Sequence, residues 1–188
     1  MINKMKIKEL MSPFYKIKYG LRSKGWIYIG KDTKILNSNN LIFEGNNQIA
    51  PYCVICPYGN GKIIFKGNVD IGMFSRITCL NKIQLGSNLM TGPNVFISDY
   101  NHLYEDINTP ICSQGIVAND NTVTIDDDCW IGTNVVICGN VHIGKHVVIG
   151  AGSFVNKDIP SYCVAVGNPA KVVKKYNFKT KKWEKYNK

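Results

Sequence analysis

This chain of 188 residues lacks three features that would point away from an ordinary cytoplasmic domain. It has no run of about 18 apolar residues, the length that a membrane-spanning helix needs. Residues 1–10 carry lysines but no continuous apolar stretch, so we expect no export signal. The seven cysteines are an odd number, which fits free thiols better than a disulfide framework. We therefore predict a single cytoplasmic domain with reduced cysteines.

A zinc site also lacks its partners in the sequence. Cys53 and Cys56 have the spacing of half a zinc finger, but no second pair of cysteine or histidine residues stands at that spacing. Free cysteine is among the most often buried residue types. We interpret both cysteines as core residues and predict no bound metal.

Negative charge is scarce at both ends of the chain. Residues 1–34 have a net charge of +7 and residues 171–188 another +7, while residues 35–170 are at −4 and the whole chain is at +10. Solubility would explain basic ends. They could also attract a polyanion such as a nucleotide cofactor, a nucleotide-linked sugar or an anionic membrane surface. We expect no nucleic-acid partner.

The chain is rich in a repeat of six residues. A period of six fits neither the 3.6 residues of an amphipathic helix nor the 2 of an ordinary strand. It is typical of a parallel β-helix, in which every sixth side chain points into one continuous core. The positions of the regular part are Ile125, Ile131, Ile137, Ile143, Ile149 and Val155.

The same phase continues upstream in sets of three, separated by gaps of eight to ten residues. Three short strands per set, with slack at one corner, predict a triangular coil that stacks on its neighbours. The fourth residue after each key position is mostly small or β-branched, which predicts a second inward slot. The upstream sets are Phe43, Ile49 and Ile55; Phe65, Ile71 and Ile77; and Leu85, Thr91 and Ile97. We predict an all-β fold, a parallel β-helix over residues 29–171.

Three segments stand outside the repeat. The interval from Ile97 to Ile125 is long for an economical solenoid, which predicts a functional loop over residues 98–124. Residues 1–28 are expected to form a basic cap, with a short helix over 3–22 that Pro13 interrupts. Residues 172–188 form a lysine-rich, aromatic tail that we expect to pack beside the last coils. We expect the N-terminal helix to cap the open end of the solenoid. Its apolar residues at roughly helical spacing are Met5, Leu10, Phe14, Ile17 and Leu21. An interfacial membrane helix with weak surface association is the alternative.

Five short segments, taken in their order along the chain, indicate a protein family. They are Ile97-Ser-Asp-Tyr-Asn-His102, Trp130-Ile-Gly-Thr133, Ile149-Gly-Ala-Gly-Ser153, Asn156-Lys-Asp-Ile-Pro160 and Gly167-Asn-Pro-Ala-Lys171. Over residues 25–175 the chain resembles the hexapeptide-repeat acyltransferases. It is most similar to the galactoside, maltose and xenobiotic acetyltransferases and to the O-acetyltransferases of surface polysaccharides. The resemblance implies a left-handed parallel β-helix, acetyl-CoA as co-substrate, and a homotrimer with each site between protomers.

By that resemblance His102 matches the catalytic base. Transfer of an acetyl group from a thioester to a hydroxyl needs a group that takes the hydroxyl proton, and imidazole, with an ordinary pKa of about 6.5, suits this near neutrality. Asp99, Glu105 and Asp106 are candidates to orient the ring, and Asp99 is our prediction.

The cofactor residues carry over in the same way. The positions implied to bind acetyl-CoA are Trp130, Thr133, Ala151, Asn156, Lys157, Lys171 and Lys174. Related enzymes often have arginine where this chain has the last two lysines, and lysine loses bidentate contact with phosphate. Ser75 and Arg76, at a coil corner, are the candidates for acceptor binding. Arg76 could pair with a carboxylated or phosphorylated sugar or lie free on the surface.

We predict a CoA-dependent acetyltransferase that acts on a hydroxyl of a sugar or surface-glycan precursor. N-acetylation of an amino sugar nucleotide is the nearest alternative, because the same base could deprotonate an amine. A zinc-dependent hydratase of this fold would need His102, His142 and His146 to converge. A non-catalytic solenoid would not need the loop and the cofactor segments together.

Overall fold

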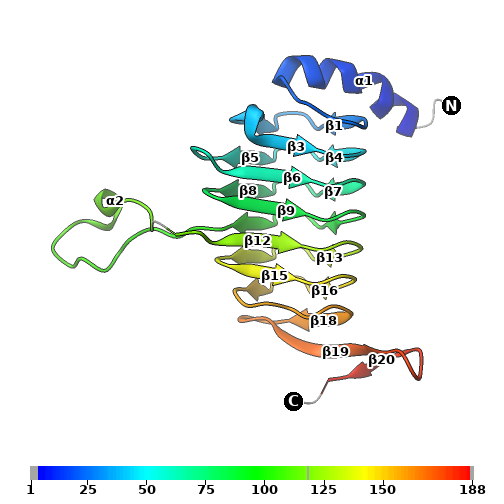
Figure 1. Cartoon of the computed structure of the whole chain (residues 1–188), viewed down its shortest axis with the longest axis vertical. Coiled ribbons are helices and arrows are strands. Elements are labelled where there is room, and N and C mark those ends of the chain that lie inside the picture. The colour runs from blue at the N-terminus through cyan, green and yellow to red at the C-terminus, as the bar shows by residue number, and fades with distance from the viewer. Residues whose placement is uncertain (1–3, 118, 187–188) are drawn as a thin grey trace.

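The six-residue period carries the chain from one face of a triangular prism to the next. The structure, a computed structural model, describes residues 4–117 and 119–186 (Figure 1). Successive coils pair through parallel strands, so a residue in one coil lies directly opposite its counterpart in the next. Ile55, Ile77 and Ile97 form such a ladder, and each is at most 1% exposed. The predicted parallel β-helix is confirmed.

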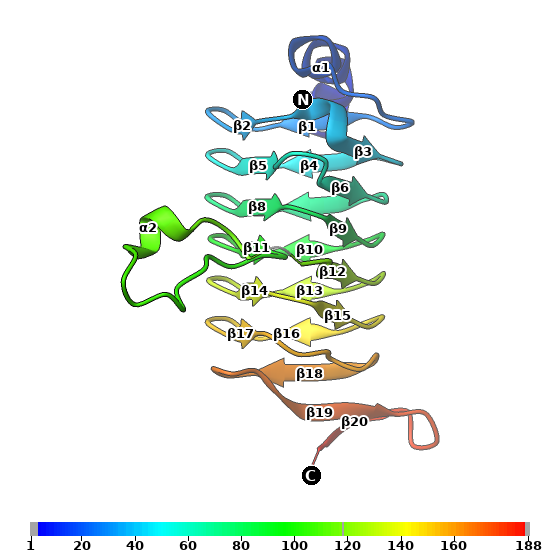
Figure 2. The ribbon, with the colours of Figure 1, turned by 60° about the vertical axis from the view of Figure 1, so that its left-hand side comes forward.

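Among the described residues the strands form three faces, one along each side of the prism (Figures 1 and 2). The first face consists of β1 (Ile27–Ile29), β4 (Asn47–Ile49), β7 (Val69–Ile71), β10 (Met90–Thr91), β13 (Trp130–Ile131), β16 (Val148–Ile149) and β18 (Cys163–Val166), then antiparallel β19 (Lys171–Asn177) and β20 (Lys182–Lys185). The second consists of β2 (Lys34–Ile35), β5 (Val54–Pro57), β8 (Arg76–Cys79), β11 (Phe96–Ser98), β14 (Val136–Cys138) and β17 (Phe154–Val155). The third consists of β3 (Leu41–Phe43), β6 (Lys62–Phe65), β9 (Lys82–Leu85), β12 (Thr122–Ile125) and β15 (Val141–Ile143), and a 3-10 turn (Ser38–Asn40) precedes it.

The core is the column of side chains inside these three faces. Both predicted inward slots are filled as expected: Ile131 and Ile149 are fully buried, and so are Val135 and Val147. Cys53 and Cys56 are buried in the same way, as the repeat predicts. Burying an isoleucine or valine side chain stabilises the fold by about 1.5–3 kcal/mol. The ladders therefore hold the prism together.

Tight corners join the faces, and we name them for the faces they join. The first corner joins the first and second faces, the second corner joins the second and third, and the third corner leads back to the first. At the first corner a Cβ on Gly132 would lie 2.6 Å from the backbone nitrogen of Ala151 on the next coil. Only glycine fits such a close approach between coils.

The N-terminal helix covers the first coil with a face other than its apolar stripe. Helix α1 (Lys4–Tyr19) lies across the first coil (Figure 1) and contains Pro13. Tyr15 and Ser12 are buried against β1, whereas Leu10 and Ile17 are 77% and 83% exposed. Of the predicted apolar stripe only Leu21, beyond the helix, is buried, and the side chain of Met5 lies outside the described residues. The apolar residues of the helix itself therefore point outward.

The C-terminal tail folds back as a hairpin under the last coil. Strand β19 pairs antiparallel with β18, and β20 pairs with β19. The ring of Trp183 stacks 6.3 Å from the ring of His146, which anchors the hairpin at the third corner. Lys174 and Lys175 are exposed beside it. Neither described helix has the length and hydropathy of a membrane span.

Candidate active site

The long loop leaves the prism at the second corner, between the end of β11 at Ser98 and the start of β12 at Thr122 (Figure 2). It contains a short helix, α2 (Ile111–Gln114), and residue 118 lies outside the described part. The two arms of the loop pair just outside the prism: Leu103 N–H donates to the Gly115 carbonyl at 3.1 Å, and Val117 N–H donates to the Asn101 carbonyl at 3.0 Å. The root of the loop is therefore a hydrogen-bonded stem.

His102 lies on this stem, opposite Ile116. Its side chain is exposed, and the ring centroid is 6.5 Å from that of Tyr100 in an edge arrangement. Among the described residues no side chain hydrogen-bonds to the imidazole, so both ring nitrogens remain open to a substrate. An exposed imidazole on a braced stem can act as a general base.

Asp99 does not orient this imidazole, and that expectation needs correction. The Asp99 carboxylate is fully buried and accepts the backbone N–H groups of Leu80 at 2.8 Å, Asn81 at 2.9 Å and Lys82 at 3.0 Å. Both oxygens are thus occupied by the neighbouring coil. The role of Asp99 is to fix the start of the loop.

The two other candidate acids are also engaged within the loop. The Glu105 carboxylate accepts the N–H of Tyr104 at 3.2 Å. The Asp106 carboxylate accepts the Thr109 hydroxyl at 2.7 Å and the Asn108 N–H at 2.9 Å, and these bonds lower its pKa. None of the three candidate carboxylates therefore orients His102 within this chain.

Arg76 is connected to the stem of His102 through two tyrosine rings, whereas Ser75 is buried. The Arg76 guanidinium is exposed on β8 and lies 3.4 Å from the hydroxyl of Tyr58, whose ring packs edge-on against Tyr100 at 5.9 Å. Burial raises the pKa of Tyr100. Ser75 is 1% exposed, and its hydroxyl oxygen accepts the N–H of Val95. Its predicted contact with an acceptor is thus contradicted.

Tyr58 and Tyr100 were missed by the sequence reasoning. Tyr100 lies in the segment from Ile97 to His102, but a tyrosine there does not by itself indicate a functional role. Tyr58 follows β5 by one residue and meets Tyr100 only because the coils stack. Together with Arg76 they connect the second face to the stem that carries His102.

The predicted acetyl-CoA residues fall into separate places on the prism. Thr133 and Ala151 are neighbours on the first corner, where the Gly152 N–H donates to the Thr133 carbonyl at 2.8 Å. Lys171 pairs with Val166 at the end of the first face that adjoins this corner, and Lys174 pairs with Val164. Thr133, Ala151 and Lys171 therefore lie along this edge, while Lys174 lies further in on the first face, in register with Val148 and Trp130.

The remaining cofactor positions stand apart from that edge. Trp130 is half exposed on the outer side of the first face, between Met90 and Val148 in register. Asn156 and Lys157 are exposed after β17, at the second corner and two coils from the loop. One chain therefore does not bring all the predicted site residues together.

The three histidines do not meet in this chain. His142 Nε2 lies 3.0 Å from Asp126 on the third face, and His146 stacks on Tyr162 at the third corner. Within the described residues no group of three His, Cys, Asp or Glu side chains is placed to hold a metal ion.

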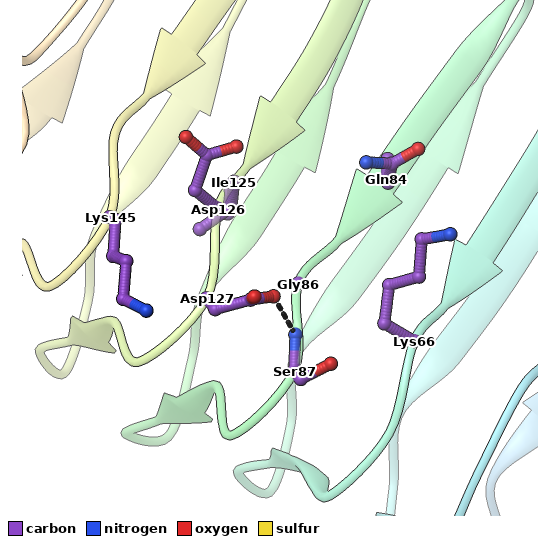
Figure 3. A pocket seen from close by; sticks show the side chains of 8 residues that line it. All are labelled: Lys66, Gln84, Gly86, Ser87, Ile125, Asp126, Asp127 and Lys145. Atoms are coloured by element: carbon purple, nitrogen blue, oxygen red, sulfur yellow. Dashed lines mark hydrogen bonds between the residues drawn. The ribbon is translucent and has the colours of Figure 1, made fainter.

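A hollow of about 390 Å³ lies where the third face meets the third corner (Figure 3). Its lining is polar: Asp127 accepts the N–H of Ser87 at 2.6 Å, and Lys66 and Lys145 stand at its edges. None of the predicted site residues lines it. We do not assign the transfer chemistry to this hollow.

Comparison with known proteins identifies the family. Residues 122–157 match the family described as Bacterial transferase hexapeptide (six repeats). The candidate lipopolysaccharide biosynthesis O-acetyl transferase WbbJ of Escherichia coli is 36% identical over 156 residues, which cover 80% of this chain and 80% of that protein. This chain is a member of the hexapeptide-repeat acetyltransferases.

Two further relatives agree with this membership. The galactoside O-acetyltransferase of Lactococcus lactis is 41% identical over 143 residues, covering 71% of this chain and 67% of that protein. Among solved structures, AntD, an N-acyltransferase from Bacillus cereus, has a TM-score of 0.73 and 21% identity, covering 90% of this chain and 91% of AntD. That likeness shows the hexapeptide fold alone.

Proposed function

We propose that this protein transfers an acetyl group from acetyl-CoA to a hydroxyl of a sugar in a glycan or glycan precursor. The observation that carries the proposal is the exposed imidazole of His102 on the braced stem of the long loop. The names of the relatives, a galactoside and a lipopolysaccharide O-acetyltransferase, support a sugar as the acceptor. We place the reaction in the cytoplasm, where acetyl-CoA is made.

In this mechanism His102 takes the proton of the acceptor hydroxyl as its oxygen attacks the thioester carbonyl. The new C–O bond forms, the C–S bond breaks, and the proton on the imidazole passes to the departing CoA thiolate. Backbone N–H groups facing the carbonyl would stabilise the oxyanion by about 3 kcal/mol per donor. No covalent enzyme intermediate is needed, because both substrates bind together.

The first corner is the place we propose for the cofactor. Ala151 is exposed there and carries only a methyl group, so a narrow pantetheine arm could lie along this edge close to the backbone. Trp130 offers an exposed apolar ring nearby on the first face, and Lys171 and Lys174 offer charge for the phosphates. Asn156 and Lys157 would reach the cofactor from the second corner of a neighbouring protomer.

We propose a homotrimer because the base and the cofactor edge lie at different corners of one chain. The second face separates His102 from Thr133 and Ala151, so a site with both needs the loop of one protomer and the edge of another. The tip of the loop is suited to such a contact, since Ile107 is 94% exposed and Ile111 58% exposed. Closed threefold symmetry would supply three identical sites.

For the acceptor we propose contact with Arg76, Tyr58 and Tyr100. A guanidinium beside two phenol rings can pair with an anionic sugar while the rings cover its apolar face. This retains Arg76 from the sequence prediction and replaces Ser75.

The deciding experiment measures CoA formation by chromatography, because exposed Cys112 would consume a thiol reagent. Purified protein receives acetyl-CoA with a panel of neutral sugars, acidic sugars and amino sugar nucleotides. CoA release and an O-acetylated product with a hydroxyl acceptor are the expected result. Release with amino sugar nucleotides alone would replace the proposal by N-acetylation. No release above that of acetyl-CoA alone, across the panel, would favour a non-catalytic solenoid.

A further inference from the structure

The inner face of α1 is fully used by the first coil. The Ser12 hydroxyl accepts the N–H of Ile27 at 2.9 Å, and the Lys8 ammonium donates to the side chain of Gln48. Tyr15 is buried, and its ring packs edge-on against Tyr28 at 5.7 Å. Positions 8, 12, 15 and 19 share one side of a helix, so this side caps the prism.

The opposite side of α1 is apolar and faces solvent. Its members recur at helical spacing and form one stripe. Their exposed fractions are 45% for Ile7, 77% for Leu10, 39% for Met11, 54% for Phe14 and 83% for Ile17. Phe14 has two neighbours within the chain: the ammonium of Lys18 lies 5.8 Å from its ring centroid, and its ring meets that of Tyr15 edge-on at 5.5 Å. All five side chains nevertheless keep the exposures given above. A contiguous exposed apolar stripe of this kind marks an interaction surface.

The border of the stripe is positively charged. Lys6 and Lys18 are exposed on its two sides, and Arg22 and Lys24 follow directly after the helix. Glu9 is the one acidic residue between positions 4 and 31. This combination of an apolar face and a cationic border is complementary to anionic lipid, in which the apolar side chains enter the headgroup region and the lysines meet the phosphates.

The position of the helix leaves this side accessible. Helix α1 lies across the N-terminal end of the prism, while the loop projects from the middle of the prism (Figures 1 and 2). The apolar stripe of the helix is exposed to solvent. A planar surface could therefore meet the helix without touching the loop.

We propose that the outer face of α1, formed by Ile7, Leu10, Met11, Phe14 and Ile17 with Lys6 and Lys18, docks on the surface of an anionic lipid bilayer. The helix lies in the plane of the interface and does not span it. This docking is independent of the transfer chemistry. If three chains associate with parallel axes, three such helices meet the same plane, and their weak contacts reinforce one another.

The test is co-sedimentation of the full-length protein with vesicles of phosphatidylcholine alone and of an equal mixture of phosphatidylcholine and phosphatidylglycerol. We expect binding to the mixed vesicles at low salt, little binding to the neutral vesicles, and release as salt rises. The variant Leu10→Glu/Ile17→Glu should bind at least about tenfold more weakly, because two inserting side chains become charged. Both residues are exposed, so the fold should persist.

The matched control is Leu36→Glu/Ile42→Glu, which makes the same changes at exposed apolar residues on the wall of the prism. It should bind mixed vesicles as the wild type does. Equal loss in the control, equal binding of the wild type to neutral vesicles, or no binding would each overturn the proposal. So would a change of oligomeric state in the α1 variant by sedimentation velocity, since a second copy would then occupy the stripe. Turnover with soluble substrates should stay unchanged in the α1 variant, which separates this test from that of the proposed function.

Discussion

Asn81 N–H donates to Oδ2 of Asp99 at 2.9 Å. Through Asn81, the coil of β8 and β9 holds both arms of the loop that follows β11 in the next coil. Asp99 begins the outgoing arm. The side-chain amide of Asn81 donates to the carbonyls of Asn119 at 2.8 Å and Asn121 at 3.2 Å on the returning arm. The stem that carries His102 is therefore fixed from the coil of β8 and β9.

Replacement of Asp99 by alanine tests this clamp. Three partly buried N–H groups lose their acceptor. At the low end of about 1 kcal/mol for each donor, we expect a loss of about 3 kcal/mol in the free energy of unfolding. Urea unfolding followed by circular dichroism measures it. Asp120→Ala, which removes an exposed carboxylate from the same loop, is the control and should change little. Equal stability of the two variants would mean that the clamp is not important.

His102→Gln tests the base. We expect kcat to fall by at least about a hundredfold while the KM for acetyl-CoA stays nearly the same, because the imidazole acts on the acceptor proton. His142→Gln alters a histidine paired with Asp126 on the third face and should keep normal turnover. Near-normal kcat in His102→Gln would remove the residue from the mechanism.

Lys171→Glu/Lys174→Glu tests the phosphate contacts of the cofactor. We expect the KM for acetyl-CoA to rise by roughly tenfold or more, since a hydrogen bond to a charged group contributes about 1.5–3 kcal/mol. Lys179→Glu/Lys182→Glu places the same charges at the far end of the hairpin and should have a smaller effect. If both variants show the same KM, the first pair has no special contact with the cofactor.

Thiol labelling tests the burial of the cysteines. Burial raises the pKa of Cys79 to about 12 and that of Cys129 to about 11, so at pH 8 both remain protonated and unreactive. Cys112 is exposed in α2 and should be alkylated first by iodoacetamide, as peptide mass spectrometry would detect. In Cys112→Ser the fast phase should disappear. Fast labelling of Cys79 or Cys129 in the native protein would contradict the packed core.

The prism could be predicted because its stabilising interactions repeat. A residue such as Ile137 is defined by its phase, and the phase alone places it in a ladder between Ile97 and Val155. Ser75 was predictable by the same reasoning: it is the fourth residue after Ile71 and therefore occupies the inward slot. The prediction for Ser75 followed its exposed neighbour Arg76 and not the repeat.

The orientation of α1 could not be read from its pattern. Helical spacing shows that an apolar stripe exists, but it does not show which side must face the first coil. That coil has an open edge, where the N–H of Ile27 has no strand to accept it. The Ser12 hydroxyl meets this need and an apolar side chain cannot. In the same way, Asp99 was assigned by its closeness to His102 in sequence, whereas its partners lie on the preceding coil.

Because the loop leaves and rejoins the prism at the second corner, its length and composition can change without shifting the register of any pair of strands. The clamp between Asp99 and Asn81 needs only the two ends to be kept. Loops with different tips could then occur on the same coils, so that acceptor recognition changes while the edge formed by Thr133 and Ala151 stays the same.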